Sequence, residues 1–495
     1  MLVKLEIPPG VYRNATEYSA GGRWYDTNLI RWIDGLMMPV GGWQKFSLTP
    51  VTGTCRGLFS WRDNDNYRWL AVGTNDKLYV HDEGSLFDIT PVGFVPGQAD
   101  SLAGLGYGAL DYGEQEYGTA RTGTSGLILE AATWSFDSWG ENLVGCSTGD
   151  GKVYEWSGTT SSPAAVIANA PTNNRFVYVS EQRHLVVLGA GGDPRKIQWS
   201  DAEDNTDWTP TSSNQAGDFV LNTNGHLRCG VKTRGETLIL TSTDAHVKRF
   251  IGSPLVFSFD RVGTQCGVAG PNAVASVNGT VVWLGTDAKP YVYNGVVQNI
   301  PCDIEDWLEA QFNRVKQTEV YCGTLAEQSE VWWFFPANDG DTKYAVWNYK
   351  QNIWYIGELD RTAWLDRGVW GHPVAVSSDG YLYLQENGNT DSGVTRATSI
   401  YAKAGYMEIG SGDNIMDVLQ ILPDEQTSGN VNVTIKTRFV PNGTEYTYGP
   451  YTVRSDGYTD TRAAGRQASI TIQAVDDADW RVGTYRADVK ASGAR

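Results

Sequence analysis

Short stretches of aromatic and β-branched residues recur along the chain, separated by polar turns rich in Gly, Asp and Asn. The unit RGLFSWRDNDNYRWLAVGTNDKLYVHD, which begins at Arg56, holds three such stretches. Similar units follow at intervals of roughly 40–50 residues, a spacing typical of propeller blades, and they begin at Thr133, Arg175, His226, Asn272, Val320 and Trp370. Each small sheet must bury its faces against its neighbours. The pattern predicts an all-β chain with a β-propeller of six or seven blades over residues 51–390.

The segment before the first unit, residues 1–50, is predicted to close the propeller. Its stretch MMPVGGWQKFS, Met37–Ser47, is strand-like. A propeller closes best when one blade takes strands from both ends of the repeat array, because this removes an exposed edge. We therefore expect the stretch to pair with the last blade near Tyr381–Gln385. Two β-sandwiches are the alternative architecture, although their strands would recur at a steadier spacing without a repeated unit.

Two segments interrupt the repeat. Residues 97–125 are rich in Gly and Tyr and lack periodicity, which predicts a long loop inserted between the first two blades. The second segment, PCDIEDWLEAQFNRVKQ from Pro301, has the spacing of a helix that packs against the propeller rim, with Asp303 as its N-cap. The apolar face of this helix is formed by Ile304, Trp307, Leu308, Phe312 and Val315.

After residue 390 the character of the chain changes. Apolar and polar residues alternate in NVNVTIKTRFVPNGTEYTYGPYTV, RQASITIQAV and neighbouring stretches, with turns at Asn442-Gly443 and Asp456-Gly457. Such alternation predicts a separate antiparallel β-sandwich over residues 391–495. We expect its solvent face to carry four basic residues, namely Lys436, Arg438, Arg481 and Arg486.

Composition agrees with β structure and limits the partners. The 495 residues include 56 Gly, 19 Trp and 25 Tyr, which suit turns and half-buried pleated surfaces. Hydrophobic residues make up 41% and charged residues 19%, which excludes a disordered chain. Lys and Arg number 39 against 57 Asp and Glu, so the formal net charge is −18. A groove that grips a nucleic-acid backbone needs the opposite sign, so binding of nucleic acid by charge attraction is not expected.

The N-terminal residues and the cysteines restrict compartment and cofactors. The first residues lack the apolar run of a secretory signal, and no stretch approaches the ~20 apolar residues that span a bilayer. We therefore expect synthesis in a cytoplasm. The six cysteines show no CxxC spacing, which predicts buried thiols rather than a zinc site or a disulfide framework. The five histidines show no HxxxH or HxH spacing, so neither a metal nor another cofactor is expected.

Candidate catalytic groups are few. The sequence GCSTG around Ser147 matches a hydrolase motif, but it joins two strands across a turn and lacks the following helix that the motif requires. Acidic turns occur at DNDN, with Asp63 and Asp65, and at SDAEDNTDW, and they lack EF-hand spacing. Paired carboxylates and tryptophans such as Trp332 could serve a carbohydrate-binding or glycoside-hydrolysing propeller, which is the alternative function. Solvated turns and blade core are the simpler interpretation.

Three stretches resemble the tail hub, or nozzle, proteins of short-tailed bacteriophages. They are NLIRWIDGLMMPVGGWQKF from Asn28, GLGYGALDYGEQEYGTAR, and the blade end IQWSDAEDNTDW; the C-terminal GRQASITIQAVDDADWRVGTYRADV is similar to the end of the same proteins. The resemblance implies a β-propeller with an extra β-domain and no catalytic residues. It also implies a virion location in the tail, where six copies form a ring below the portal and adaptor and attach fibres or a needle.

In such a ring the genomic DNA passes through without specific binding. An acidic wall repels phosphate and keeps the duplex mobile, which gives the negative charge a physical reason. Acidic turns from some blades are therefore predicted to face the lumen. The candidates are Asp201, Glu203, Asp204 and Asp207, followed by Asp63 and Asp65.

Overall fold

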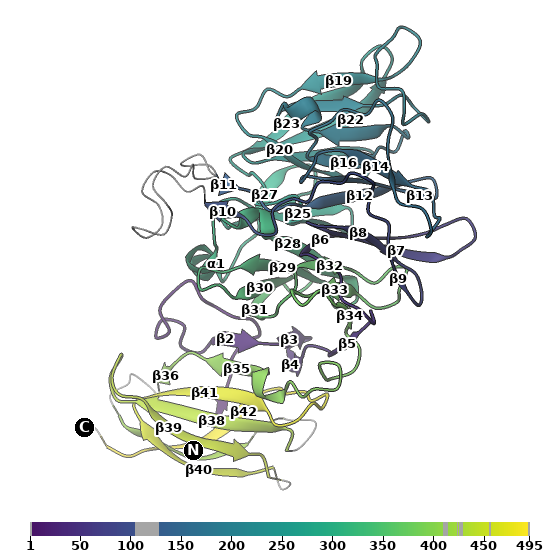
Figure 1. Cartoon of the computed structure of the whole chain (residues 1–495). Helices are drawn as coiled ribbons and strands as arrows, with labels where there is room; N and C mark the ends of the chain where they lie inside the picture. Colours follow the sequence, from purple (N-terminus) through teal and green to yellow (C-terminus); the bar gives the residue numbers. More distant parts are fainter. Residues whose placement is uncertain are drawn as a thin grey trace, which may run out of the picture.

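The computed structural model describes residues 2–103, 128–408, 414–422, 424, 429–454 and 457–493. Within these residues the chain is almost entirely β-strand, and α1 (Glu305–Gln311) is the one α-helix (Figure 1). None of the helices in this part of the chain combines the length and the apolar character needed to cross a membrane. The elements form two bodies, a large array of small sheets and a sandwich at one end of it (Figure 1).

Seven four-stranded antiparallel sheets follow one another along the chain. The first three are β6 (Cys55–Arg62) to β9 (Leu86–Asp88), β12 (Trp134–Trp139) to β15 (Ala165–Val166), and β16 (Phe176–Val179) to β19 (Gly217–Val220). The next three are β20 (Leu227–Lys232) to β23 (Val256–Thr264), β24 (Val274–Val277) to β27 (Val297–Asn299), and β28 (Tyr321–Leu325) to β31 (Ile353–Glu358). The seventh joins β32 (Ala363–Leu365), β33 (Val374–Val376), β34 (Leu382–Gln385) and β5 (Trp43–Lys45).

These sheets are the blades of a β-propeller. The first strand of each sheet contacts the first strand of the next one, and β32 of the seventh sheet contacts β6 of the first, so the ring closes. The propeller therefore has seven blades, at the upper end of the predicted number.

The last blade takes its outer strand from the N-terminal segment. In β5, Trp43, Gln44 and Lys45 pair with Gln385, Leu384 and Tyr383 of β34, which is the pairing predicted from the sequence. The residues just before β5 behave differently, because β4 (Leu36–Pro39) pairs with β3 (Ile30–Ile33) in a hairpin. Only part of Met37–Ser47 thus closes the propeller.

The sandwich is built from both ends of the chain. One sheet has the order β1 (Leu2–Leu5), β42 (Tyr485–Ala491), β37 (Met416–Leu422) and β40 (Thr459–Gly465). The other has the order β2 (Trp24–Asn28), β35 (Tyr401–Ala404), β41 (Gln467–Ala474), β38 (Val431–Arg438) and β39 (Tyr446–Thr452), and β36 (Met407–Glu408) also pairs with β41. The assignment of residues 1–50 to the propeller alone is therefore wrong, since β1 and β2 complete the sandwich.

One basic residue of the sandwich is not on its solvent face. Lys436 is half-buried and pairs with Glu445, and Arg481 and Arg486 are exposed as expected. Arg438, however, is buried: its Nε donates to Gln467 at 2.6 Å and its guanidinium lies 3.7 Å from the ring centroid of Tyr406. The alternation of buried and less buried residues stops at the end of β38. There the buried guanidinium contacts the ring of Tyr406 and the side-chain amide of Gln467.

The sandwich docks on the outer strand of the sixth blade. Thr27 of β2 donates a hydrogen bond to the carbonyl of Ile356 in β31 at 2.7 Å, and Asn28 accepts one from the backbone N–H of Glu358. Next to this contact, the buried Arg31 of β3 lies between the carboxylates of Glu330 and Glu386, at 3.0 and 2.8 Å. The N-terminal segment therefore joins the sandwich to blades six and seven.

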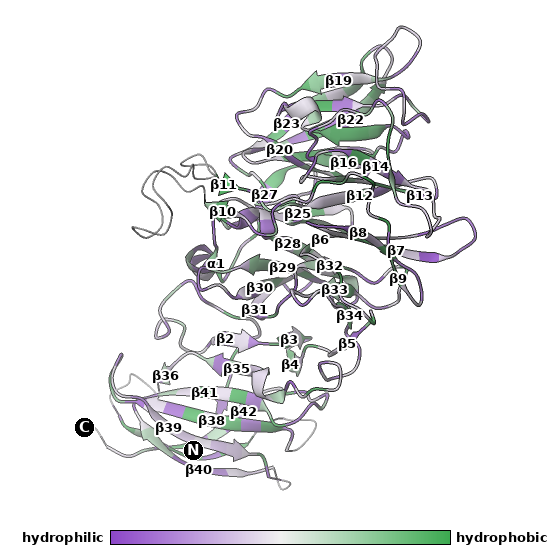
Figure 2. Cartoon of the chain, in the orientation of Figure 1, coloured by the Kyte–Doolittle hydropathy of each residue, from purple (hydrophilic) through white to green (hydrophobic). Residues whose placement is uncertain are grey.

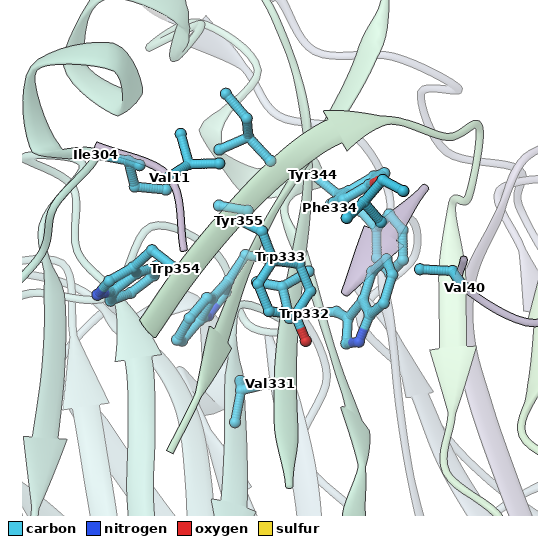
Figure 3. Packing of buried hydrophobic residues seen from close by; sticks show 14 of the residues in the cluster. Val11, Val40, Ile304, Val331, Trp332, Trp333, Phe334, Tyr344, Trp354 and Tyr355 are labelled. Carbon is cyan, nitrogen blue, oxygen red and sulfur yellow. The ribbon is translucent and has the colours of Figure 1, made fainter. Parts of the chain in front are cut away.

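Aromatic residues fill the blades, and hydropathy follows the strands (Figure 2). In blade six, Trp332 and Trp333 of β29 (Glu330–Pro336) and Trp354 of β31 are almost fully buried, and Figure 3 shows them packed beside Val11 and Val40 of the N-terminal segment. These tryptophans are blade core, as the simpler interpretation held. Between blades, rings lie against glycine: a Cβ on Gly73 would come within 2.4 Å of Trp134.

The helix forms where predicted but is capped differently. Its apolar face is buried apart from the half-buried Val315, but Asp303 makes no cap and pairs with Arg23 at 3.1 Å. The side chain of Asn14 takes the capping role, because its Oδ1 accepts from the N–H of Asp306 and its Nδ2 donates to the carbonyl of Cys302. A cap from about 290 residues away along the chain carries no local sequence signal.

Candidate functional site

The two faces of the propeller differ in what they carry. In an antiparallel four-stranded blade, the first and third connections leave at one face and the second connection and the link to the next blade leave at the other. Asp63 and Asp65 lie in the first connection of blade one, and residues 201–207 lie in the third connection of blade three. Both acidic turns are thus on the same face, whereas α1 and residues 97–103, at the start of the insertion, belong to the opposite face.

The carboxylates of the acidic turn of blade three accept hydrogen bonds from backbone and side-chain groups of the same loop. Asp201 Oδ1 accepts from the N–H of Gln215 at 2.7 Å, and Asp207 accepts from the N–H of Thr209 and from the amide of Asn214. Asp204 accepts from both the hydroxyl and the N–H of Thr206, and these bonds lower the pKa of its carboxyl. Asp201 and Asp207 are half-buried, so their carboxylates serve mainly the loop conformation.

Glu203 is the member of this turn whose charge faces outward. It is exposed, lies in the left-handed region with φ of 64°, and pairs with Arg183 at 2.9 Å. In blade one, Asp63 accepts from the N–H of Tyr67 and from the indole N–H of Trp69, and Asp65 is exposed. In these two turns the exposed carboxylates are therefore Asp65, Glu203 and Asp204, and their place facing a lumen stays a prediction.

The opposite face closes the propeller axis. Glu130, at the base of the insertion, binds Arg175 and Arg228 at 3.1 Å each, and these arginines stand at the first strands of blades three and four. Burial by itself would raise the pKa of Glu130, but the two guanidinium groups outweigh it and lower this pKa below the usual range. Burial, followed by repulsion from Arg228, lowers the pKa of His226 to about 4, so this histidine is neutral at pH 7.

The other arm of the insertion is anchored in the same way. Arg56 of blade one binds Asp100 at 3.0 Å and Glu319, next to the first strand of blade six, at 3.1 Å. The N–H of Ser101 donates to Glu319, and the hydroxyl of Ser101 lies 2.9 Å from that of Thr318. The cavity left at this end, lined by residues from blades two to six, is about 20 Å³, room for roughly one water molecule.

Between these arms the insertion leaves the face as a short stem. Leu102 and Ala103 (β10) pair with Ile128 and Leu129 (β11), and the stem stands away from the blades (Figure 1). Residues 104–127, which include most of the Gly/Tyr-rich stretch, lie outside the described residues. The ion pairs at this end join residues from 44 to 263 positions apart, with no regular spacing, so the sequence carried no signal for them.

The serine of the hydrolase-like motif is engaged within its own turn. Ser147 is fully buried at the end of β13 (Asn142–Ser147), and its hydroxyl accepts from the N–H of Gly149. All six cysteines are buried free thiols, as predicted. Among the described residues, no group of three or more His, Cys, Asp or Glu side chains could hold a metal ion.

One buried group was missed by the sequence reasoning. Lys248 of β22 (Asp244–Gly252) is almost fully buried, with its ammonium 3.9 Å from the ring centroid of Phe257 and 4.9 Å from that of Tyr178. Among the described residues it finds no hydrogen-bond acceptor. Burial, with the nearby charge of Lys232, lowers its pKa to about 7. In this strand Lys248 lies on the face opposite to Ala245 and Val247, which the alternation assigns to the core, so the pattern gave no warning.

Comparison with known proteins finds a likeness to solved structures alone. No family model and no curated protein matches the chain. Among solved structures, streptogramin B lyase is similar over 69% of this chain and 96% of its own, at 10% identity and a TM-score of 0.42. BamB from Moraxella catarrhalis is similar over 78% of this chain and 97% of its own, at 8% identity and a TM-score of 0.37. Both are bacterial β-propeller proteins. At TM-scores below 0.5, the blade count rests on the strand pairing described above.

Proposed function

We propose that this protein is a non-catalytic, structural subunit of a short-tailed bacteriophage tail, of which copies form a ring that continues the DNA channel. Three of the stretches that resemble nozzle proteins lie in the described part of the chain and hold the fold together. Asn28–Phe46 links the sandwich to blades six and seven, and Trp199, Trp208 and Trp480, in two of the other stretches, are buried. A resemblance carried by such positions supports a shared architecture.

Because the propeller axis is closed, DNA in this proposal cannot pass through a single propeller. The cavity at the axial end holds roughly one water molecule, so a duplex cannot thread a single propeller. The channel must therefore lie between copies arranged around a common axis. The acidic turns would border it on one face of each propeller, where they would repel phosphate.

The observation that carries the proposal is a pair of unlike apolar surfaces at opposite ends of the molecule. The distal patch, on blades three and four, consists of Phe219, Phe250, Ile251 and Leu255, each at least 43% exposed. The sandwich patch consists of Phe439, Val440 and Tyr446, each at least 40% exposed. Figure 1 shows β19 and β22 at one end of the molecule and β39 at the other. Two different surfaces at opposite ends favour head-to-tail contacts, which form a ring when the rotation between successive copies closes.

Charge favours the same contact. Residues 29–390 hold 41 acidic and 25 basic residues, whereas residues 1–28 and 391–495, which hold the sandwich strands, have 16 and 14. Two propellers would repel each other, but the nearly neutral sandwich can approach an acidic propeller with little repulsion. The sandwich of one copy is therefore the suitable partner for the distal patch of the next copy.

Native mass spectrometry tests the proposal. The full chain is measured alone and with the portal–adaptor complex of the same phage, and a ring of fixed copy number, six, is expected with the complex. The double variant Phe250→Asp and Ile251→Asp should prevent the ring, whereas the control Val92→Asp, at an exposed site outside both patches, should assemble normally. A chain that stays monomeric with the complex, or that hydrolyses glycosides, contradicts the proposal.

A further inference from the structure

An apolar cavity of about 610 Å³ opens in the sandwich, far from the propeller axis. This volume lies within the usual range of ligand pockets, about 300–1,000 Å³. Its interior is apolar and is lined by residues of both sheets, among them Val3, Leu5, Met407, Met416, Ile435 and Ile470. Val3, Leu5 and Met407 are only half-buried although they pack against the main core.

The cavity follows the edges of two strands. In β1 it touches Val3 and Leu5 and also Lys4, which points to the other face of the strand. Because successive side chains of a strand alternate between faces, a space that touches both kinds must run along the backbone edge. The same holds at β36, where the consecutive residues Met407 and Glu408 both line it.

Both edges lack a strand partner on the cavity side within the described part of the chain. β1 ends its sheet and pairs only with β42, and β36 pairs only with β41. The cavity thus occupies the gap between the two sheets where one more strand would bridge them. Polar groups stand at its rim: Lys4 pairs with Glu6 at 2.7 Å, and Glu408 accepts from Tyr18 and Gln467.

We propose that this cavity receives an extended segment of a partner polypeptide, with apolar residues at alternate positions, which pairs with β1 and completes the sandwich. A compact apolar ligand would fill the interior and leave in water the backbone N–H and C=O groups of β1 that point away from β42. A strand satisfies both, because its backbone bonds to the edge while every second side chain enters the cavity. Over the four residues of β1, two side chains of the segment point inward.

This docking does not rest on the tail function, and the isolated full chain can test it. The probe is the fluorescent peptide KTVTLTVTK, whose apolar residues share one face of a strand. The control peptide KTTVLVTTK has the same composition with its apolar residues adjacent, so they fall on both faces. We expect the alternating peptide to bind at least tenfold more tightly, and hydrogen exchange at Val3–Leu5 to slow when it is bound.

Matched variants locate the binding. Ala468, on β41, is buried and lines the cavity, so Ala468→Phe should fill it and weaken binding of the alternating peptide at least tenfold. The control Ala478→Phe adds the same ring outside the cavity and should bind normally. If Ala468→Phe lowers the midpoint of thermal unfolding, Leu5→Ser at the half-buried rim takes its place, with the same expected loss.

Three results would overturn the proposal. Equal affinity for the two peptides would show that the cavity does not recognise apolar residues at alternate positions. Binding of the alternating peptide without slower exchange at Val3–Leu5 would place it elsewhere. Binding of sodium oleate, reduced by Ala468→Phe, together with failure of the alternating peptide to bind, would assign the cavity to a small apolar ligand instead.

Discussion

Replacing Lys248 by Met should raise the free energy of unfolding at acidic and neutral pH, and this gain should disappear as the pH rises. The Lys248 ammonium is buried between the rings of Phe257 and Tyr178, and Lys232 is the nearest charge that acts on it. Lys232 itself is bound to Asp137 at 2.6 Å, so that carboxylate is engaged elsewhere. The charged form of Lys248 therefore lowers the free energy of unfolding.

The size of the effect follows from the pKa. Burial lowers the pKa of Lys248 to about 7, whereas a lysine in an unfolded chain titrates near about 10.4. At about 1.4 kcal/mol per pKa unit, the charged form costs about 5 kcal/mol in the folded state. Met has a similar shape and no charge, so we expect a gain of about 5 kcal/mol below pH 7.

The sign of the pH dependence is fixed by linkage. Between the folded pKa of about 7 and the unfolded pKa of about 10.4, the unfolded chain binds one more proton than the folded chain. The stability of the wild-type protein therefore rises with pH across this window, and this rise is absent in the Met variant. The two proteins should become nearly equal in stability close to pH 10.

Urea unfolding followed by tryptophan fluorescence at pH 6, 7.5, 9 and 10 measures the difference. Lys196→Met is the matched control, because Lys196 is a partly exposed lysine paired with Asp218 at 2.9 Å. Its effect should stay within about 1 kcal/mol at every pH. A Lys248→Met variant that is less stable than the wild type at pH 6, or that keeps its full gain at pH 10, would refute the reasoning.

Three further predictions concern the fold and the acidic face. Arg31→Met should cost about 3–5 kcal/mol in urea unfolding, because it leaves Glu330 buried without its cation; a loss below 1 kcal/mol would contradict this. Gly73→Ala should cost about 1–3 kcal/mol, since the new Cβ meets Trp134 at 2.4 Å; an unchanged unfolding midpoint would show that the ring moves freely. Glu203→Lys should leave assembly intact and slow DNA ejection at low salt, an effect that fades at high salt; equal ejection kinetics at low ionic strength would show that this turn does not border the DNA path.

Local chemistry was enough to predict the blades. The recurrence of short aromatic strands and Gly/Asp turns reflects pairing between neighbours in sequence, so it predicted the propeller. The pairing of Trp43–Lys45 with β34 followed from the need to close the ring without an exposed edge. The buried cysteines and the tryptophans of blade six followed from the same hydrophobic pattern. The apolar face of α1 did as well, since helical spacing is a local property.

Contacts between distant residues were not visible in the sequence. The cap of α1 comes from Asn14, and the ion pair at the axial end joins Arg56 to Glu319. No sequence spacing relates the residues of either pair. The acidic turns were recognised, but the sequence did not show that several of their carboxylates are engaged in the loops themselves, as Asp201 is with Gln215.

The sequence by itself determined an all-β propeller with an appended sandwich, because strand period and turn residues act over a few positions and need no tertiary context. Only the tertiary structure decided that there are seven blades, that β1 and β2 belong to the sandwich, and that the axis is closed by charges. It also decided that Lys248 is buried and that an apolar gap separates β1 from β36. These features depend on which surfaces meet when the ring closes and on how two chain ends share one sandwich, and such long-range packing leaves no periodic trace in the sequence.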